Sequence, residues 1–209
     1  MIVEDISFDL PEKNLTYDDE LLKRAEAGES GEVLRFWESS TYFVVLGRIC
    51  KEEEDVNLET VKRDNVPVLR RSSGGGTVLQ GPGCMNYSLI LAKNRHLDIS
   101  DLRRSYSYIL GKVINALESQ GVQAIFQPIS DLALKSNNKK FSGNAQKRGR
   151  NFILHHGTIL YNFDLTKIST YLKLPKSQPD YRQNRPHSDF VTNIKLDVRQ
   201  FKHNFALIF

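Results

Sequence analysis

Residues 70–78 (RRSSGGGTV) constrain the fold most, because two arginines and two serines lead into three consecutive glycines that open directly onto an apolar stretch. Glycine lacks the Cβ atom that keeps backbone N–H groups away from a ligand, and it adopts the φ > 0 conformations that let successive N–H groups converge on one anion. Neither common nucleotide fingerprint fits: no GxxxxGKS or GxxxxGKT sequence occurs, and Leu79 stands where a dinucleotide-binding loop has its third glycine. The segment therefore predicts an anion-binding loop or, alternatively, a strained turn between two strands.

The chain has the length and apolar content for one sizeable core, with 209 residues of which 40% are hydrophobic. No internal repeat or low-complexity linker divides it, so we expect a single domain over residues 1–209, of α/β class with a mixed (α+β) sheet and flanking helices. Apolar periodicity and turn signals predict helices over 16–27, 59–64, 100–119, 165–173 and 196–207. They predict strands over 33–37, 42–47, 66–69, 77–79, 85–91, 122–126, 131–134 and 152–163.

Three local details follow from the same patterns. The Ser39-Ser40 pair predicts a hairpin turn between the first two strands. Ser100 is expected to cap the longest helix, whose apolar stripe begins at Leu102. Residues 204–209 are too apolar for a free tail and are expected to dock on the core.

Composition limits the compartment and the partners. The N-terminus carries Glu4 and Asp5 where a signal peptide needs basic residues, and no apolar run approaches the roughly 18 residues of a membrane span. We therefore expect a cytoplasmic protein without a membrane partner. Cys50 and Cys84 suit a reducing compartment and provide neither a disulfide framework nor a metal cluster. The net charge of +4 favours an acidic or polyanionic partner.

Two further segments carry candidate chemistry. Residues 139–147 (KKFSGNAQK) combine cations with small residues downstream of Asp131. Lys140 stands at the entrance to an expected strand, from which a lysine can reach into a cleft, whereas the neighbouring cations are typical of a solvated hairpin. In residues 155–158 (HHGT), two adjacent histidines lie within an apolar run, so their rings face opposite sides of a strand. One is expected to face a site and the other to pack or hydrogen-bond; a further ligand for a metal site is not identifiable.

Together these motifs resemble the catalytic domain of lipoate-protein ligase A. They are the glycine segment followed by Asn86-Tyr87-Ser88, then Asp131-Leu132 with KFSGNAQ at 140–146, and finally HHGTIL at 155–160. The resemblance covers roughly residues 30–175. It implies the mixed α/β fold shared by biotin- and lipoate-protein ligases and by octanoyl transferases.

Ligases of that family join lipoate or octanoate to ATP as an acyl-adenylate and pass the acyl group to a lysine of a carrier domain. The resemblance implies ATP and Mg²⁺ as cofactors and lipoate as substrate. As partners it implies the lipoyl domains of dehydrogenase-complex acyltransferase subunits or the glycine-cleavage carrier protein. Lys140 matches the catalytic cation that contacts phosphate and acyl carbonyl oxygens, and Asp131 matches an aspartate near the nucleotide, acting through Mg²⁺. The other positions matching the acyl and nucleotide site are Arg70, Ser73, Gly74, Gly75, Gly76, Thr77, Asn86, Ser142, Gly143, Ala145 and His156.

The sequence departs from the family pattern at several positions, and these departures leave other enzyme classes as alternatives. Gln80-Gly81 stand where the ligases often have His-Asp, Lys147 stands where an arginine often lies, and we expect no C-terminal accessory domain in this chain. A separate accessory subunit would fit that difference. So would an ATP-independent octanoyl or lipoyl transferase fed by an acyl carrier. Transferases of this fold use a cysteine nucleophile, for which Cys84 is a candidate, although a buried structural role is commoner for such a residue.

Three other functions compete less well. Biotin ligation is disfavoured because the Gly-Arg-Gly-Arg type of loop is absent. A non-catalytic lipoate-binding module would keep the acyl site without transfer. A basic nucleic-acid-binding module would use the cations between residues 139 and 150 beside Phe141 and Phe152.

Overall fold

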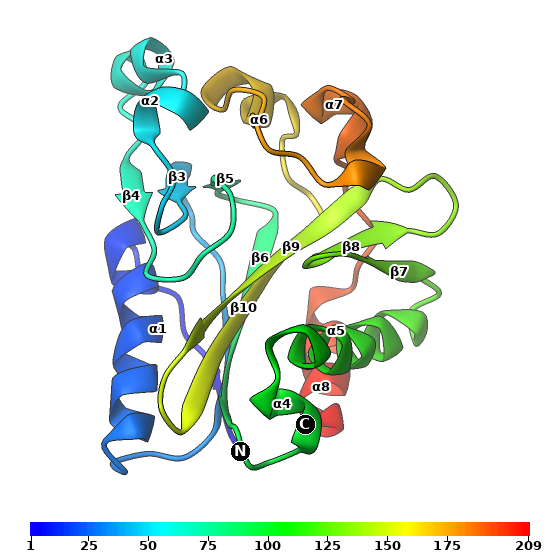
Figure 1. The fold of residues 1–209 in the computed structure, drawn as a ribbon. Coiled ribbons are helices and arrows are strands. Elements are labelled where there is room, and N and C mark those ends of the chain that lie inside the picture. The colour runs from blue at the N-terminus through cyan, green and yellow to red at the C-terminus, as the bar shows by residue number, and fades with distance from the viewer.

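The computed structural model describes residues 1–209, which form a seven-stranded mixed sheet beside a small three-stranded sheet (Figure 1). In spatial order, the large sheet consists of β1 (Ile2–Asp5), β2 (Val33–Trp37), β6 (Cys84–Ala92), β10 (Phe152–Leu160), β9 (Lys140–Arg148), β8 (Asp131–Leu134) and β7 (Ala124–Gln127). Only β1 and β2 run parallel; the other neighbours are antiparallel. The small sheet has the order β4 (Val68–Arg70), β3 (Phe43–Leu46) and β5 (Val78–Gln80).

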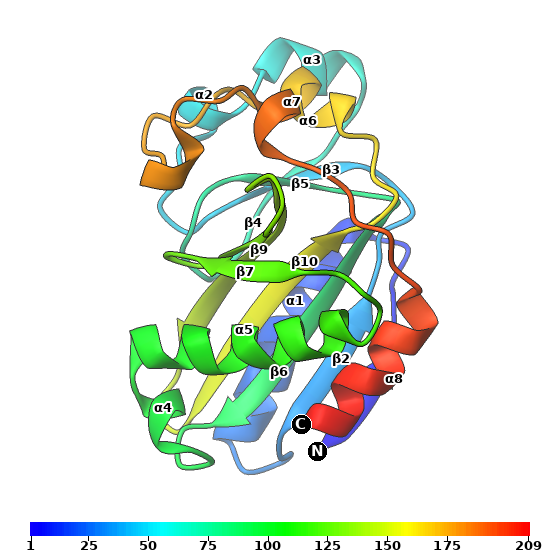
Figure 2. The same cartoon turned by 90° about the vertical axis from the view of Figure 1, so that its right-hand side faces the viewer.

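Helices cover both faces of the large sheet. Helix α1 (Pro11–Glu26) lies on one face, and α5 (Leu102–Glu118) and α8 (Val198–Ile208) lie on the other (Figure 2). Because side chains alternate along a strand, each strand serves both layers. In β2, Leu34 and Phe36 belong to the core cluster under α5 and α8, whereas Val33 belongs to the cluster under α1. Arg35 of β2 and Ser88 of β6 lie on the α1 face, where both side chains contact Asp18 of α1.

The remaining helices lie around the small sheet and at the start of α5. The group near the small sheet comprises α2 (Glu52–Asp55), α3 (Leu58–Arg63), α6 (Thr166–Tyr171) and α7 (His187–Phe190), with a single 3-10 turn at Asp180–Arg182 (Figure 1). Helix α4 (Leu97–Ser100) immediately precedes α5. None of the helices has both the length and the apolar character needed to cross a membrane.

The sequence predicted most of these elements but misplaced some details. Residues 33–37 and 42–47 do not form a hairpin: β2 belongs to the large sheet and β3 to the small one. The Ser39 hydroxyl turns the chain between the two sheets by donating to the Thr41 carbonyl at 2.8 Å. Both strands are buried throughout, so no alternation indicated that they part.

Helix ends also differ from the predictions. Asp101, not Ser100, caps α5, because its carboxylate accepts the Arg104 N–H at 2.8 Å, while the Ser100 hydroxyl donates within α4. Leu102 is exposed and lies off the apolar stripe. Helix α1 begins at Pro11, earlier than predicted, since proline suits the first turn of a helix. The expected docking of the C-terminal segment is confirmed by Phe205, which is fully buried.

Candidate active site

The glycine loop joins β4 to β5, and its carbonyl groups are bound by Arg71, whereas Arg70 binds the neighbouring turn at residues 47–50. Arg71 donates from Nη2 to the carbonyl oxygens of Gly74 at 2.7 Å and Gly76 at 2.8 Å. Arg70 donates from Nη1 to the carbonyls of Gly47 at 2.8 Å and Cys50 at 2.7 Å. The carbonyls of Gly74 and Gly76 are thus bound by the Arg71 guanidinium, whereas the N–H groups of residues 74–76 have no acceptor within the chain. This arrangement leaves backbone donors available to an anion.

The conformation of the glycine loop requires glycine at position 75, and burial affects the charged group that binds the loop. Gly75 has φ +85°, a conformation that other residues rarely adopt, and a Cβ there would lie 2.9 Å from Arg71 Nη2. Desolvation by burial lowers the pKa of Arg71 to about 10, so its guanidinium remains a cation at neutral pH.

Lys140 begins β9, as predicted, and is paired with Asp131 at the start of β8. Lys140 Nζ lies 2.8 Å from Asp131 Oδ1, and the two side chains are 27% and 11% exposed. The Tyr181 hydroxyl donates to Asp131 Oδ2 at 2.7 Å. Burial, followed by the nearby Asp131 charge, raises the pKa of Tyr181, so this hydroxyl stays a donor. A Cβ at Gly143 would lie 3.1 Å from Lys140 Nζ, so the glycine leaves room for the ammonium group.

The two histidines of β10 face opposite sides of the sheet, which confirms the sequence prediction. His155 is fully buried on the α5 face, stacks on Tyr87 and lies 3.1 Å from Gln146 Nε2. Burial lowers its pKa to about 3, so it is neutral. His156 is on the α1 face with 17% of its side chain exposed, and its Nε2 lies 2.7 Å from Ser73 Oγ.

The three predicted motifs therefore meet on one face. Ala145 pairs with His156 in the β9–β10 register, and the Ala145 methyl would be 3.8 Å from a Cβ on Gly75. Gly143 and Ala145 are two residues apart on β9 and share a face, which connects the Lys140–Asp131 pair to the glycine loop. The result is a polar site with a cation on one side and free backbone N–H groups on the other.

Four predicted residues use their side chains elsewhere. Thr77 donates to Asp55, Asn86 is buried and donates to Gln80 Oε1, and buried Ser142 accepts from Asn144. Cys84 is buried and donates to Gln80 Oε1 at 3.2 Å. Burial raises the pKa of the Cys84 thiol, which opposes formation of a thiolate. This setting is that of a structural cysteine.

Several residues near the site were missed from sequence. Asp18 of α1 lies 3.8 Å from His156 Nδ1 and forms a buried ion pair with Arg35 at 2.7 Å. Its neighbour Asp19 pairs with Lys147 at 2.8 Å and accepts the Ser72 hydroxyl at 2.6 Å. In the sequence, Asp18 and Asp19 are two adjacent carboxylates in a predicted helix, and Arg35 is a cation inside an apolar strand. Local patterns do not reveal that Asp18 and Arg35 meet.

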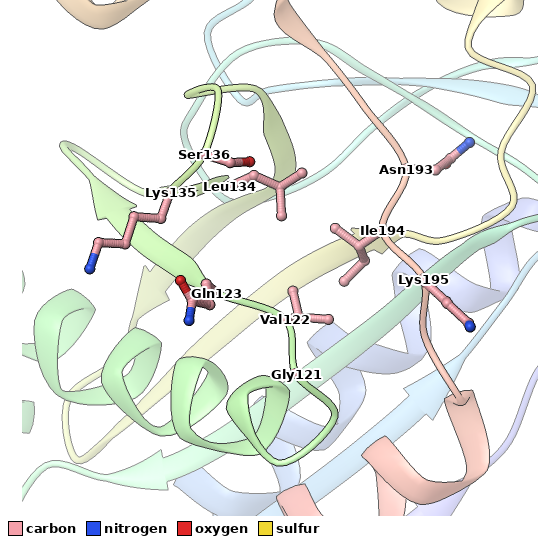
Figure 3. Close-up of a pocket in the computed structure, with 9 residues that line it drawn as sticks. All are labelled: Gly121, Val122, Gln123, Leu134, Lys135, Ser136, Asn193, Ile194 and Lys195. Atoms are coloured by element: carbon pink, nitrogen blue, oxygen red, sulfur yellow. The ribbon is translucent and has the colours of Figure 1, made fainter.

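A surface hollow of about 530 Å³ lies apart from this site. It lies beyond the C-terminal end of α5, between the β7–β8 hairpin and residues 193–195 (Figure 3). Lys135 and Lys195 lie on opposite sides of it and extend away from one another (Figure 3). None of the predicted site residues lines this hollow.

Comparison with known proteins shows the family of this chain. The family model of the lipoyl protein ligase A/B catalytic domain matches residues 10–206. The chain belongs to this family. Among curated proteins it is similar to the probable lipoate-protein ligase A of Mycoplasma pneumoniae, at 34% identity over 186 residues, which are 89% of this chain and 53% of that relative. The chain spans about half the length of the curated Mycoplasma relatives that it matches.

Solved structures show the same fold. The bipartite lipoate protein ligase of Thermoplasma acidophilum, from a study that includes its E2 lipoyl domain, has a TM-score of 0.83 at 20% identity and covers 100% of this chain and 81% of that one. A lipoate-protein ligase A bound with ATP has a TM-score of 0.81 at 21% identity, covering 100% and 83%. These similarities confirm the predicted fold class, a mixed α/β domain of the lipoate-ligase type.

Proposed function

We propose that this chain activates lipoate, or octanoate, with ATP and transfers the acyl group to a lysine of a lipoyl carrier domain. The observation that carries the proposal is Lys140, held by Asp131 across from a glycine loop with unpaired N–H groups. Family membership, the ligase names of the relatives and the ATP-bound structural neighbour support it.

In the activation step, an oxygen of the lipoate carboxylate attacks the α-phosphorus of ATP. A new P–O bond forms, the bond to pyrophosphate breaks, and pyrophosphate leaves with the electron pair. Charge lies on the phosphoryl oxygens, so the step needs positioning and cationic stabilisation rather than a protein nucleophile. The loop N–H groups and Lys140 supply donors and positive charge.

In the transfer step, a neutral lysine amine attacks the acyl carbon of the adenylate. The carbonyl oxygen becomes negative while the C–N bond forms. The C–O bond then breaks, its electron pair leaves with AMP, and the nitrogen releases a proton to solvent. An ammonium group on a flexible stem can follow charge from the phosphate to this oxyanion. We assign that role to Lys140.

Mg²⁺ prefers one or two carboxylates together with phosphate oxygens and water. No group of three or more His, Cys, Asp or Glu side chains gathers to hold a metal in this chain. Asp131 fits as one ligand, although its two oxygens hold Lys140 and Tyr181 and one of these would have to be released. When bound with the nucleotide, Mg²⁺ would neutralise phosphate charge.

The proposed partners are lipoyl domains of acyltransferase subunits or the glycine-cleavage carrier protein, and the net charge of +4 would favour an acidic one. The structural neighbour studied with its E2 lipoyl domain supports this class of partner. The buried Cys84 does not favour a cysteine transferase. Among the cations considered for nucleic-acid binding, Lys140 and Lys147 are paired with carboxylates and Arg148 donates to the Ile99 carbonyl, which does not favour that alternative.

The test incubates the full chain with a lipoyl-domain acceptor and reads the acceptor mass. One arm contains lipoate and Mg-ATP, a second contains synthetic lipoyl-AMP, and a third contains an octanoyl-loaded acyl carrier without ATP. Lys140→Ala is expected to slow transfer by about 100-fold or more, because a donor to the oxyanion is lost. Lys139→Ala, one residue earlier and without a side-chain bond to the site, is the matched control. No acylation in the lipoyl-AMP arm would refute the proposal, and acylation in the third arm alone would favour the carrier-fed transferase.

A further inference from the structure

The guanidinium of Arg71 attaches the glycine loop to the small sheet. Its Nη2 donates to the carbonyl oxygens of Gly74 at 2.7 Å and Gly76 at 2.8 Å, and its Nε donates to Ser73 Oγ at 3.0 Å. The backbone N–H of Arg71 donates to the Leu46 carbonyl at 3.0 Å, which fixes the arginine beside β3. One rigid, planar side chain therefore binds three residues of the loop at once.

These bonds also determine the direction of two backbone N–H groups. In a planar trans peptide, the N–H of one residue points away from the carbonyl oxygen of the residue before it. All peptide bonds of the loop are trans, and Arg71 binds the carbonyls of Gly74 and Gly76. The N–H groups of Gly75 and Thr77 therefore point to the opposite side of the loop from that guanidinium. Neither of these N–H groups has an acceptor within the chain.

The positive charge of Arg71 has no carboxylate partner. None of the ion pairs of the chain involves Arg71 or its neighbour Arg70. Arg71 is partly buried, and its acceptors are carbonyl oxygens and one hydroxyl group. A partly buried cation without a carboxylate attracts a nearby anion more strongly than an exposed cation does, because solvent screens it less.

We propose that Arg71 is the positioning residue of the glycine loop: it holds the loop in the shape that presents the Gly75 and Thr77 N–H groups to a phosphate group. It also adds positive charge from behind the loop. This role rests on the proposed function, in which the phosphate is that of the adenylate. A guanidinium suits the task because its planar fork binds several acceptors in a fixed geometry, whereas a lysine ammonium is a point charge on a flexible stem.

The experiment compares the binding of AMP and of adenosine to the full chain by titration calorimetry. Adenosine has the same base and ribose but no phosphate, so the ratio of the two affinities measures the phosphate contacts. Wild type should bind AMP about 10- to 100-fold more tightly than adenosine, the order expected for hydrogen bonds to a charged acceptor. Arg71→Met should lose most of this ratio by weakening AMP, while the affinity for adenosine stays within about twofold.

Two further variants separate charge, geometry and background. Arg71→Lys keeps the charge without the planar fork, and its ratio should stay closer to that of Arg71→Met than to that of wild type. Arg63→Met is the matched control, because this arginine of α3 is 70% exposed and pairs only with its neighbour Asp64. Its affinities for AMP and adenosine should both match those of wild type.

Backbone amide NMR locates the phosphate. The amide resonances of Gly75 and Thr77 should move when AMP is added to wild type and should not move with adenosine. In Arg71→Lys the same shifts should be smaller, because the two N–H groups are no longer held in place. This signature separates an effect through the loop from a direct contact between the Arg71 side chain and the ligand, which would leave these two amides unmoved.

Four results would overturn the role of Arg71. They are equal affinities of wild type for AMP and adenosine, an equal loss of both affinities in Arg71→Met, a wild-type ratio in Arg71→Lys, and Gly75 and Thr77 resonances that respond to lipoate but not to AMP. Thermal denaturation checks the fold of each variant, and Arg71→Lys carries the test if Arg71→Met does not fold. A wild-type chain that neither binds AMP nor transfers from lipoyl-AMP would instead refute the proposed function, and this role with it.

Discussion

Replacing Arg35 with methionine tests how the buried ion pair supports the site. The Arg35 guanidinium donates to the Ile6 carbonyl at 3.1 Å, the Asn14 carbonyl at 2.8 Å, Asn14 Oδ1 at 2.8 Å and Asp18 Oδ1 at 2.7 Å. Methionine fills much of the same volume but removes the charge and all four donors. Asp18 then remains a buried carboxylate without a cation.

Breaking one side of a buried ion pair destabilises a protein by about 3–5 kcal/mol. For a chain of 209 residues, this lowers the unfolding midpoint by roughly 6–20 °C. The double variant Arg35→Met with Asp18→Leu removes both charges and should regain most of that loss, ending about 1–2 kcal/mol below wild type, because Ile6 and Ser88 lose a partner.

The assay is urea denaturation followed by circular dichroism, with thermal melting as a second measurement. Lys202→Met is the matched control, because its pair with Asp5 is exposed and contributes about 1 kcal/mol or less. The reasoning is refuted if Arg35→Met behaves like this control, or if the double variant is as unstable as Arg35→Met alone.

Three further predictions concern the site and the core. Cys84→Ala should leave the transfer rate from lipoyl-AMP within about twofold of wild type, because the thiol is buried and its pKa is raised; a loss of about 100-fold would instead identify a nucleophile. Gly75→Ala should destabilise the protein by about 1–2 kcal/mol and weaken lipoyl-AMP binding, because alanine is strained at φ +85°. Gly31→Ala has open space around its Cβ and should change neither the stability nor the binding. Calorimetry measures both quantities. The pKa of His155 is about 3 in the folded chain, below its unfolded value near 6.5, so below about pH 6.5 the unfolded chain binds one more proton than the folded chain. The free energy of unfolding therefore falls as the pH drops from about 6.5, by up to about 1.4 kcal/mol per pH unit. His155→Gln should flatten urea-denaturation midpoints between about pH 6.5 and 5, and an unchanged slope would contradict this assignment.

The sequence by itself predicted the glycine loop, the strand that starts at Lys140 and the opposite orientations of His155 and His156. These are local properties: glycine content, the end of an apolar run and the two-residue period of a strand depend only on near neighbours. The motifs in their order also indicated the family, which the match over residues 10–206 bears out.

Only the tertiary structure decided which of these residues meet and which face the site. Ser73 and His156 are 83 residues apart, and Tyr181 reaches Asp131 across 50 residues. The strands β2 and β3 belong to different sheets, and Asp18 meets His156 because α1 packs on the face of the large sheet that His156 occupies. Local periodicity predicts that a strand has two faces, but burial of the apolar clusters under α1 on one side and under α5 and α8 on the other determines which face is which.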